Sequence, residues 1–233
     1  MIKLIAVDVD GTLTDKDGTI NLDSVRVLRE LKEKGIEVML ATGRSIFETY
    51  TLSKFLGFAN FGIGENGGVI YYKEPTRVKL FGNFNDALYA YEYLSREFEG
   101  IKINQRMPRL TEILLERNFD KEAANKLLNK IGFKVLDSGI VFHLSSLEIN
   151  KGVALRYLCE SLKIKKEEVA SIGDSEVDVP MFKVSGYAFL VNKNFQIDEK
   201  ELSDTKLIKT KTQGPEGVIE AVEWLMNNDL IQY

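Results

Sequence analysis

The chain has 233 residues, of which 44% are hydrophobic, and its formal net charge at pH 7 is −4. Single domains usually have roughly 100–150 residues, so we expect one large domain or a main domain with a smaller one. The acidic balance excludes nucleic acid as the expected partner, because binding to a phosphate backbone requires a basic face. No apolar run approaches the roughly 20 residues of a membrane span, so we expect no membrane partner either.

The cysteine content and the first residues bear on the compartment. Cys159 is the single cysteine and cannot form an internal disulfide. The chain enters an apolar run at once, without a charged and apolar leader of the secretory type. Both features lead us to expect a cytoplasmic protein.

The first sixty residues predict two strand-loop-helix units. An apolar strand over residues 2–7 leads into the sequence D-V-D-G-T-L-T at residues 8–14. A helix over Ser24–Lys34 and a strand over Ile36–Leu40 follow, and apolar residues between 47 and 55 predict a second helix. Strands that are apolar rather than strictly alternating are typical of a parallel sheet covered on both faces. We therefore predict an α/β fold, with a Rossmann-like parallel sheet in its core.

The pattern changes after Phe61, where four glycines surround Glu65-Asn66 and a hairpin-like strand covers Val69–Tyr72. A boundary is predicted over Pro75–Asn83. Two helices and four β-like segments follow, at Ala87–Phe98 and Lys121–Ile131, and at Ile101–Ile103, Thr111–Leu115, Phe133–Leu136 and Ile140–Leu144. This order departs from strict β-α alternation and predicts an inserted α+β cap domain over residues 83–149.

The parallel pattern resumes after Asn150, so residues 1–82 and 150–233 form one discontinuous core domain in this prediction. Its second part contains a helix from Lys151, a strand over Val169–Ile172, a short helix at Met181–Phe182, strands over Tyr187–Val191 and Lys206–Ile208, and a helix over Gly217–Met226.

Two carboxylates, Asp8 and Asp10, stand directly after the first predicted strand, where Gly11 lets the chain turn. Ligands of open α/β sheets bind at the carboxyl ends of the strands. Two acids buried together repel each other, and oxygen ligands on a tight loop suit a hard cation such as Mg²⁺. A solvated surface turn is the alternative for this segment when it is taken alone.

Other chemistry-bearing groups fall at strand ends or helix starts farther along the chain. They are Thr42 with Gly43, Lys151, and Asp174 with Asp178. In a parallel sheet these positions converge on one edge, although each has an ordinary interpretation by itself: a helix cap, a solvated lysine, a surface loop. The only histidine, His143, falls in a predicted cap strand and is expected to be structural.

In this order and over nearly the whole length, the motifs D-x-D-G-T-L-T, Thr42, Lys151 and G-D-x-x-x-D (173–178) resemble the haloacid dehalogenase-type phosphatases. The 108 residues between Thr42 and Lys151 resemble those of the Cof-like branch, whose α+β cap is inserted between the second and third motifs. That branch includes archaeal phosphoglycolate phosphatases of similar length.

The resemblance implies a Mg²⁺-dependent phosphatase for a small phosphorylated metabolite, with 2-phosphoglycolate as the expected substrate. It implies that Asp8 is the nucleophile and forms an aspartyl phosphate, and that Asp10 is the general acid and base. Thr42, the backbone N–H of Gly43 and Lys151 would then bind the phosphate.

The resemblance also implies a metal site made by Asp8, the main chain of Asp10, Asp174 and Asp178. Within this set Asp178 suits a second role, which is to orient Lys151 or a bound water. One residue departs from the family pattern: Val177 stands where the branch commonly has Asn before the last acid.

Several other functions stay open at this point. A sugar-phosphate phosphatase or phosphomutase uses the same scaffold, and an inactive phosphate-binding relative fits the change at Val177. A phosphoacceptor signalling module is disfavoured by the inserted domain, and a calcium loop by the absence of the later Glu after Asp15-Lys16-Asp17-Gly18. Tyrosines on the first cap helix suggest contacts in a homodimer.

Overall fold

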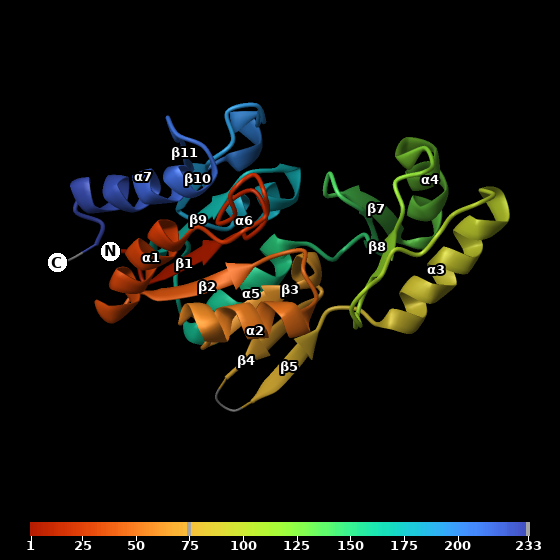
Figure 1. Cartoon of the computed structure of the whole chain (residues 1–233), viewed down its shortest axis with the longest axis horizontal. Helices are drawn as coiled ribbons and strands as arrows, with labels where there is room; N and C mark the ends of the chain where they lie inside the picture. The colour runs from red at the N-terminus through yellow and green to blue at the C-terminus, as the bar shows by residue number, and fades with distance from the viewer. Residues whose placement is uncertain (74–75, 232–233) are drawn as a thin grey trace.

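The computed structural model describes residues 1–73 and 76–231 and places them in two lobes, each built on its own sheet (Figure 1). The described part of the larger sheet has, in spatial order, β11 (Lys206–Lys209), β10 (Tyr187–Leu190), β9 (Val169–Gly173), β1 (Leu4–Val7), β2 (Glu37–Ala41), β3 (Phe61–Gly64), β4 (Val69–Tyr72) and β5 (Arg77–Leu80). The smaller sheet has the order β6 (Ile113–Leu115), β8 (Phe142–Ser146), β7 (Phe133–Asp137).

The first strand, β1, lies at the centre of the larger sheet, between β9 and β2. It pairs in parallel with both, so that Val7 stands opposite Leu40 on one side and Ile172 on the other. The strands from β11 to β3 are parallel, and β4 and β5 join one edge in antiparallel pairing. This mixed, mostly parallel sheet confirms the predicted α/β class.

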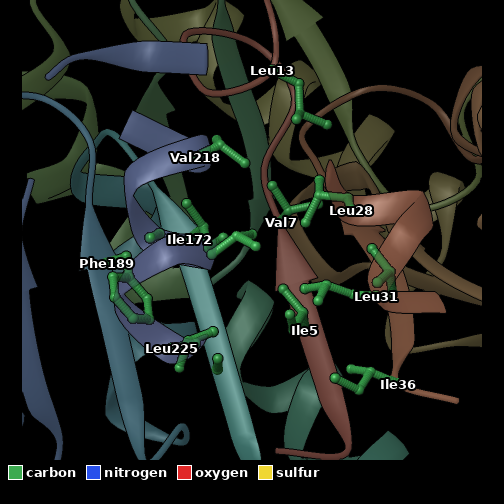
Figure 2. Close-up of a cluster of buried hydrophobic side chains, with 14 of the residues drawn as sticks. Ile5, Val7, Leu13, Leu28, Leu31, Ile36, Ile172, Phe189, Val218 and Leu225 are labelled. Carbon is green, nitrogen blue, oxygen red and sulfur yellow. The ribbon is translucent and has the colours of Figure 1, made fainter. Parts of the chain in front are cut away.

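Helices cover both faces of the larger sheet because side chains along each strand alternate between the faces. Ile5 and Val7 of β1 belong to the core beneath α1 (Leu22–Glu33) and α7 (Gly214–Asn227) (Figure 2). Leu4 and Ala6 belong to the core beneath α5 (Lys151–Leu162) and α6 (Val179–Lys183). Among the described residues, no helix is long and apolar enough to cross a membrane. The described helices are α1 (Leu22–Glu33), α2 (Ile46–Leu56), α3 (Phe84–Glu97), α4 (Lys121–Leu128), α5 (Lys151–Leu162), α6 (Val179–Lys183) and α7 (Gly214–Asn227).

The smaller sheet packs with α3 and α4 around a separate hydrophobic core, which includes Leu94, Ile113, Leu128 and Leu144. In Figure 1 this lobe stands beside the carboxyl ends of the central strands, and both termini lie at the opposite end of the molecule. On this basis we propose residues 83–149 as the cap domain, inserted between two parts of one core domain.

Two predicted features differ from the structure. The segment Ile101–Ile103 forms only an isolated bridge, between Ile103 and Leu115, instead of a strand. The segment read as a boundary contains β5, whose four residues are all exposed at the sheet edge, so no burial pattern marked it as a strand. Pro75, where that boundary was predicted to begin, lies outside the described residues.

The turn between β3 and β4 packs closely against the start of α5. Glu65, Asn66 and Gly67 all have positive φ angles, 54°, 52° and 103°. A Cβ atom at Gly67 would overlap the backbone carbonyl of Asn150, so glycine is required for this close approach. The turn thereby fixes the position of Lys151, the first residue of α5.

Candidate active site at the carboxyl edge of the sheet

The predicted site residues come together at the carboxyl edge of the larger sheet. Asp8 follows β1, Thr42 follows β2 and Asp174 follows β9, and the parallel pairing brings these three strand ends side by side. A cavity of about 200 Å³ at this edge is lined by Asp8, Asp10, Thr42, Gly43 and Lys151, together with residues of the cap. Asp174 lines a wider cleft of about 1130 Å³ next to it, and the two hollows share Asp10 and Ile140.

Lys151 is the electrostatic centre of the site. Its side chain is fully buried, and Nζ donates to Asp8 Oδ1 at 2.6 Å and to Asp178 Oδ1 at 2.7 Å. Burial alone would lower the pKa of Lys151, but the two carboxylates outweigh burial and raise this pKa above its ordinary value. The ammonium group is therefore charged whenever Asp8 and Asp178 are ionised.

Asp178 is held by the loop that it closes. Its Oδ2 accepts hydrogen bonds from the backbone N–H groups of Asp174 and Ser175, at 3.0 and 3.1 Å, and from the Ser175 hydroxyl. A Cβ atom at Gly173 would lie 2.5 Å from the Asp178 carboxylate, so this glycine makes room for it. Both carboxylate oxygens already have partners, which suits a residue that positions Lys151.

The acidic cluster carries more negative charge than its lysine can balance. Asp8, Asp174 and Asp178 each offer a carboxylate oxygen, and these oxygens lie within 4.8 Å of one another. Burial and the neighbouring carboxylates raise the pKa of Asp8 well above its ordinary value despite Lys151. Burial and Asp178 raise the pKa of Asp174 to about 7.

Such a group of buried, oxygen-only ligands fits a hard divalent cation, which would stabilise the ionised carboxylates. The fit extends to the loop after β1, because Gly11 has a φ of 82° and a Cβ there would lie 2.5 Å from Asp174 Oδ2. Asp174 therefore sits directly against the backbone between Asp10 and Thr12.

Asp10 pairs with a residue that sequence reasoning left without a role. Arg44 Nη2 and Nε donate to the two carboxylate oxygens of Asp10, at 2.6 and 2.9 Å. Asp10 is the strongest factor that raises the pKa of Arg44. Arg44 directly follows Thr42 and Gly43, which the sequence assigned to the site, but a single sequence cannot show which loop faces this segment.

Thr42 does not serve as the N-cap of α2, because that position belongs to Ser45. The fully buried Thr42 hydroxyl instead accepts a hydrogen bond from the backbone N–H of Arg44 at 3.2 Å. Its own proton stays available to an acceptor in the cavity, and the adjacent Gly43 lies against the side chain of Asn66.

The cap lines one side of the cavity with side chains that the sequence did not assign to the site. Arg109 Nη1 donates to the Gly43 carbonyl at 2.7 Å and also pairs with Glu112. His143 Nδ1 lies 3.0 Å from Glu112 Oε2 and 3.1 Å from Asn66 Nδ2. His143, expected to be structural, thus lines the cavity as well, and no periodicity in the sequence marks Arg109 or Glu112 for this position.

Comparison with known proteins gives one consistent family. The sequence profile of the haloacid dehalogenase-like hydrolase family matches residues 5–106 and 97–221 of this chain. A phosphoglycolate phosphatase of Archaeoglobus fulgidus is 35% identical over 223 residues, 96% of each chain, and one of Nitrosopumilus maritimus is 34% identical over 226 residues, also 96% of each.

Solved structures give the same result. A protein of Thermoplasma acidophilum superposes with a TM-score of 0.82 at 26% identity, over 99% of this chain and 100% of that one. A haloacid dehalogenase-like hydrolase of B. subtilis superposes with a TM-score of 0.75 at 25% identity, over 96% of this chain and 100% of that one.

The raised pKa of Asp174 predicts how stability depends on pH and on a divalent cation. Without the cation, the folded state holds this proton up to about pH 7, whereas the ordinary pKa of an aspartate is 3.8. The protonated Asp174 carboxyl therefore contributes fully to the stability of the folded state below about pH 4, and this contribution is lost as the pH rises through 7. We expect Asp174→Asn to raise the Tm in EDTA at pH 8 and to abolish the rise in Tm that Mg²⁺ gives the native chain.

Thermal melts at pH 5 and pH 8, in EDTA and in Mg²⁺, test this expectation. Glu176→Gln, which changes an exposed acid in the same loop, is the matched control and should behave like the native chain. If the Tm of Asp174→Asn responds to pH and to Mg²⁺ as the native chain does, the Asp174 carboxylate neither destabilises the fold when ionised nor binds the metal.

Proposed function

This chain belongs to the haloacid dehalogenase-like hydrolases and is a phosphatase, and we propose that it hydrolyses 2-phosphoglycolate through an aspartyl phosphate on Asp8. The observation that carries the proposal is the buried Asp8 carboxylate, held 2.6 Å from Lys151 in a cavity that the cap lines on one side. The substrate is taken from the relatives of Archaeoglobus fulgidus and Nitrosopumilus maritimus.

In this proposal the phosphate binds between the carboxyl ends of β1 and β2. The Thr42 hydroxyl and the backbone N–H of Gly43 donate to phosphoryl oxygens, and Lys151 supplies a fixed positive charge. Such groups stabilise the charge that spreads over the equatorial oxygens during phosphoryl transfer. Because Asp178 and Asp8 hold the ammonium group from two sides, little reorganisation is needed when the substrate arrives.

The reaction then has two steps. Asp8 attacks phosphorus, the bond from phosphorus to the leaving oxygen breaks, and Asp10 donates a proton to that oxygen. In the second step Asp10 takes a proton from water, whose oxygen attacks the same phosphorus and releases Asp8 with inorganic phosphate. Two carboxylates next to each other divide the roles of nucleophile and acid–base.

Asp10 must be free of Arg44 to act as an acid, because the guanidinium group of Arg44 donates to both of its carboxylate oxygens. A bound phosphate places a second anion near Arg44 and competes with Asp10 for its guanidinium group. We propose that substrate binding draws Arg44 toward the phosphate, so that Asp10 can hold the proton that the leaving oxygen requires.

The divalent cation is proposed to be Mg²⁺, held by Asp8, Asp174 and the main-chain carbonyl of Asp10. When bound, it neutralises charge between the nucleophile and the phosphoryl group. Asp178 was also predicted as a ligand, but its two occupied oxygens favour a positioning role for it. Val177 stands in place of the usual Asn, and the Ser175 hydroxyl of this loop donates a hydrogen bond to Asp178.

The two relatives named above favour 2-phosphoglycolate over a sugar phosphate or a phosphomutase substrate, because both are phosphoglycolate phosphatases. An inactive relative is disfavoured because every group that the reaction requires is present. Cytoplasmic location, from Cys159, and a homodimer through Tyr89, Tyr91 and Tyr93 stay proposals.

Turnover assays test the proposed function. Purified protein should release inorganic phosphate from 2-phosphoglycolate in Mg²⁺ and not in EDTA, and sugar phosphates should be poorer substrates. If no phosphate ester in a broad panel is hydrolysed in Mg²⁺, the proposal is wrong.

Asp8→Asn should abolish turnover and leave the fold intact, because the amide cannot form the aspartyl phosphate. The expected loss in kcat is on the order of 10³-fold or more. Asp17→Asn changes an exposed acid of the same loop, whose side chain accepts hydrogen bonds from Thr19, and is the matched control that should keep native rates. Native rates in Asp8→Asn would exclude it as the nucleophile.

Lys151→Met should cost both activity and stability, because it leaves Asp8 and Asp178 buried without a partner. Breaking a buried ion pair from one side typically costs about 3–5 kcal/mol. Adding Asp178→Asn removes one unpaired charge, so the double variant should regain part of the unfolding free energy and none of the activity. Recovery of both quantities together would show that Lys151 serves the fold alone.

A further inference from the structure

The proposed function leaves the cap side of the cavity without a role. Five cap residues line it, Arg109, Ser138, Ile140, Val141 and His143, and they face Asp8, Asp10 and Lys151 of the core. A phosphate held by the core groups would therefore direct the remainder of the substrate toward the cap. What the cap offers there determines which phosphate esters fit.

Arg109 is the charged side chain on this wall, and its hydrogen bonds are incomplete. The side chain is only 6% exposed. Nη1 donates to the Gly43 carbonyl and to Glu112, but Nε is buried and has no partner, and Nη2 forms no hydrogen bond with any described residue. A buried donor without an acceptor is costly, and a guanidinium group is always charged.

The free nitrogens form one edge of the planar guanidinium group. Nε and Nη2 together make a fork that can bind both oxygens of a carboxylate, and such bidentate pairs combine strength with a fixed geometry. Arg109 lines the cavity and its Nη1 donates to the carbonyl of Gly43, whose N–H is proposed to bind the phosphate, so the guanidinium group lies close to the proposed phosphate position.

The loop that carries Arg109 is anchored to the core and does not depend on packing within the cap alone. Glu65, fully buried in the β3–β4 turn, accepts hydrogen bonds from the backbone N–H groups of Leu110 and Thr111 and from the Thr111 hydroxyl. These are the two residues that follow Arg109, so its backbone is fixed relative to the strand ends of the core.

Glu112 and His143 hold the arginine in place from the cap side. Glu112 is fully buried and contacts both Arg109 and His143 Nδ1. Burial would raise the pKa of Glu112, but His143 and Arg109 outweigh burial and keep this pKa below its ordinary value. Glu112 is therefore an ionised positioning residue that is shared between two basic side chains.

From this geometry we infer that Arg109 forms a subsite for a carboxylate group of the substrate, so that the cap selects small phosphorylated carboxylic acids over neutral phosphate esters. The inference rests on the proposed function, and it assigns the part of the substrate that the phosphate-binding residues do not contact. Glu65 and Glu112 are the residues that position Arg109 for this contact.

The experiment compares two substrates that differ in one group, 2-phosphoglycolate and 2-hydroxyethyl phosphate, in the native chain and in Arg109→Met. We expect the native chain to prefer the acid. Arg109→Met should lower kcat/KM for 2-phosphoglycolate about 10- to 100-fold, the usual effect of losing a hydrogen bond to a charged group. Its kcat/KM for 2-hydroxyethyl phosphate should change less than about 3-fold.

Two further variants keep the test decisive. Arg106→Met removes the same side chain from an exposed position of the same cap segment and should leave both kcat/KM values unchanged. Arg109→Lys keeps the charge without the fork, and it should retain the preference for the acid only in part. It also provides the comparison if Arg109→Met does not fold.

The outcomes separate this inference from the proposed function. Equal losses for both substrates in Arg109→Met and Arg109→Lys would show that Arg109 contacts the phosphate or serves the fold, and would overturn the inference alone. An unchanged preference would do the same. No turnover of any phosphate ester by the native chain would overturn the proposed function and, with it, the inference.

Discussion

The site depends on one buried ammonium group that is held between two carboxylates. Lys151 balances part of the negative charge that β1 and the loop after β9 bring together, and its contacts with Asp8 and Asp178 lie 143 and 27 residues away along the chain. The third carboxylate, Asp174, has no basic partner among the described residues. The core therefore folds around an excess of acidic groups, which a bound cation or a proton on Asp174 can balance.

A strained turn connects this charge cluster to the cap. The turn between β3 and β4 contacts the start of α5 through Gly67, and its Glu65 carboxylate holds the backbone of Leu110 and Thr111. Positive φ angles at two non-glycine residues, Glu65 and Asn66, are unfavourable and persist only where the surroundings impose them. The turn thus positions Lys151 through Gly67, and it positions Arg109 through Glu65.

The sequence predicted the parts of this arrangement that follow local rules. Apolar runs and strand ends are local, so the α/β class and the convergence of Asp8, Thr42 and Asp174 could be derived before any coordinates. The contacts of Arg44 with Asp10 and of Glu65 with Thr111 could not be derived in this way, because the tertiary packing decides which loops face each other. The exposed edge strand β5 was missed for a related reason, since strands without a buried face leave no hydrophobic pattern.

The charge of the site links binding of the cation to binding of the substrate. At the proposed phosphate site, the aspartates of this ion-pair cluster outnumber the two cationic side chains that pair with them, and a phosphate dianion adds to this excess. A divalent cation offsets the repulsion, so the cation and the phosphate must each strengthen the binding of the other to the same degree. Arg109 and Glu112 of the cap form an ion pair and together add no net charge to this sum. The core groups concerned are Asp8, Asp10, Asp174 and Asp178, with Lys151 and Arg44.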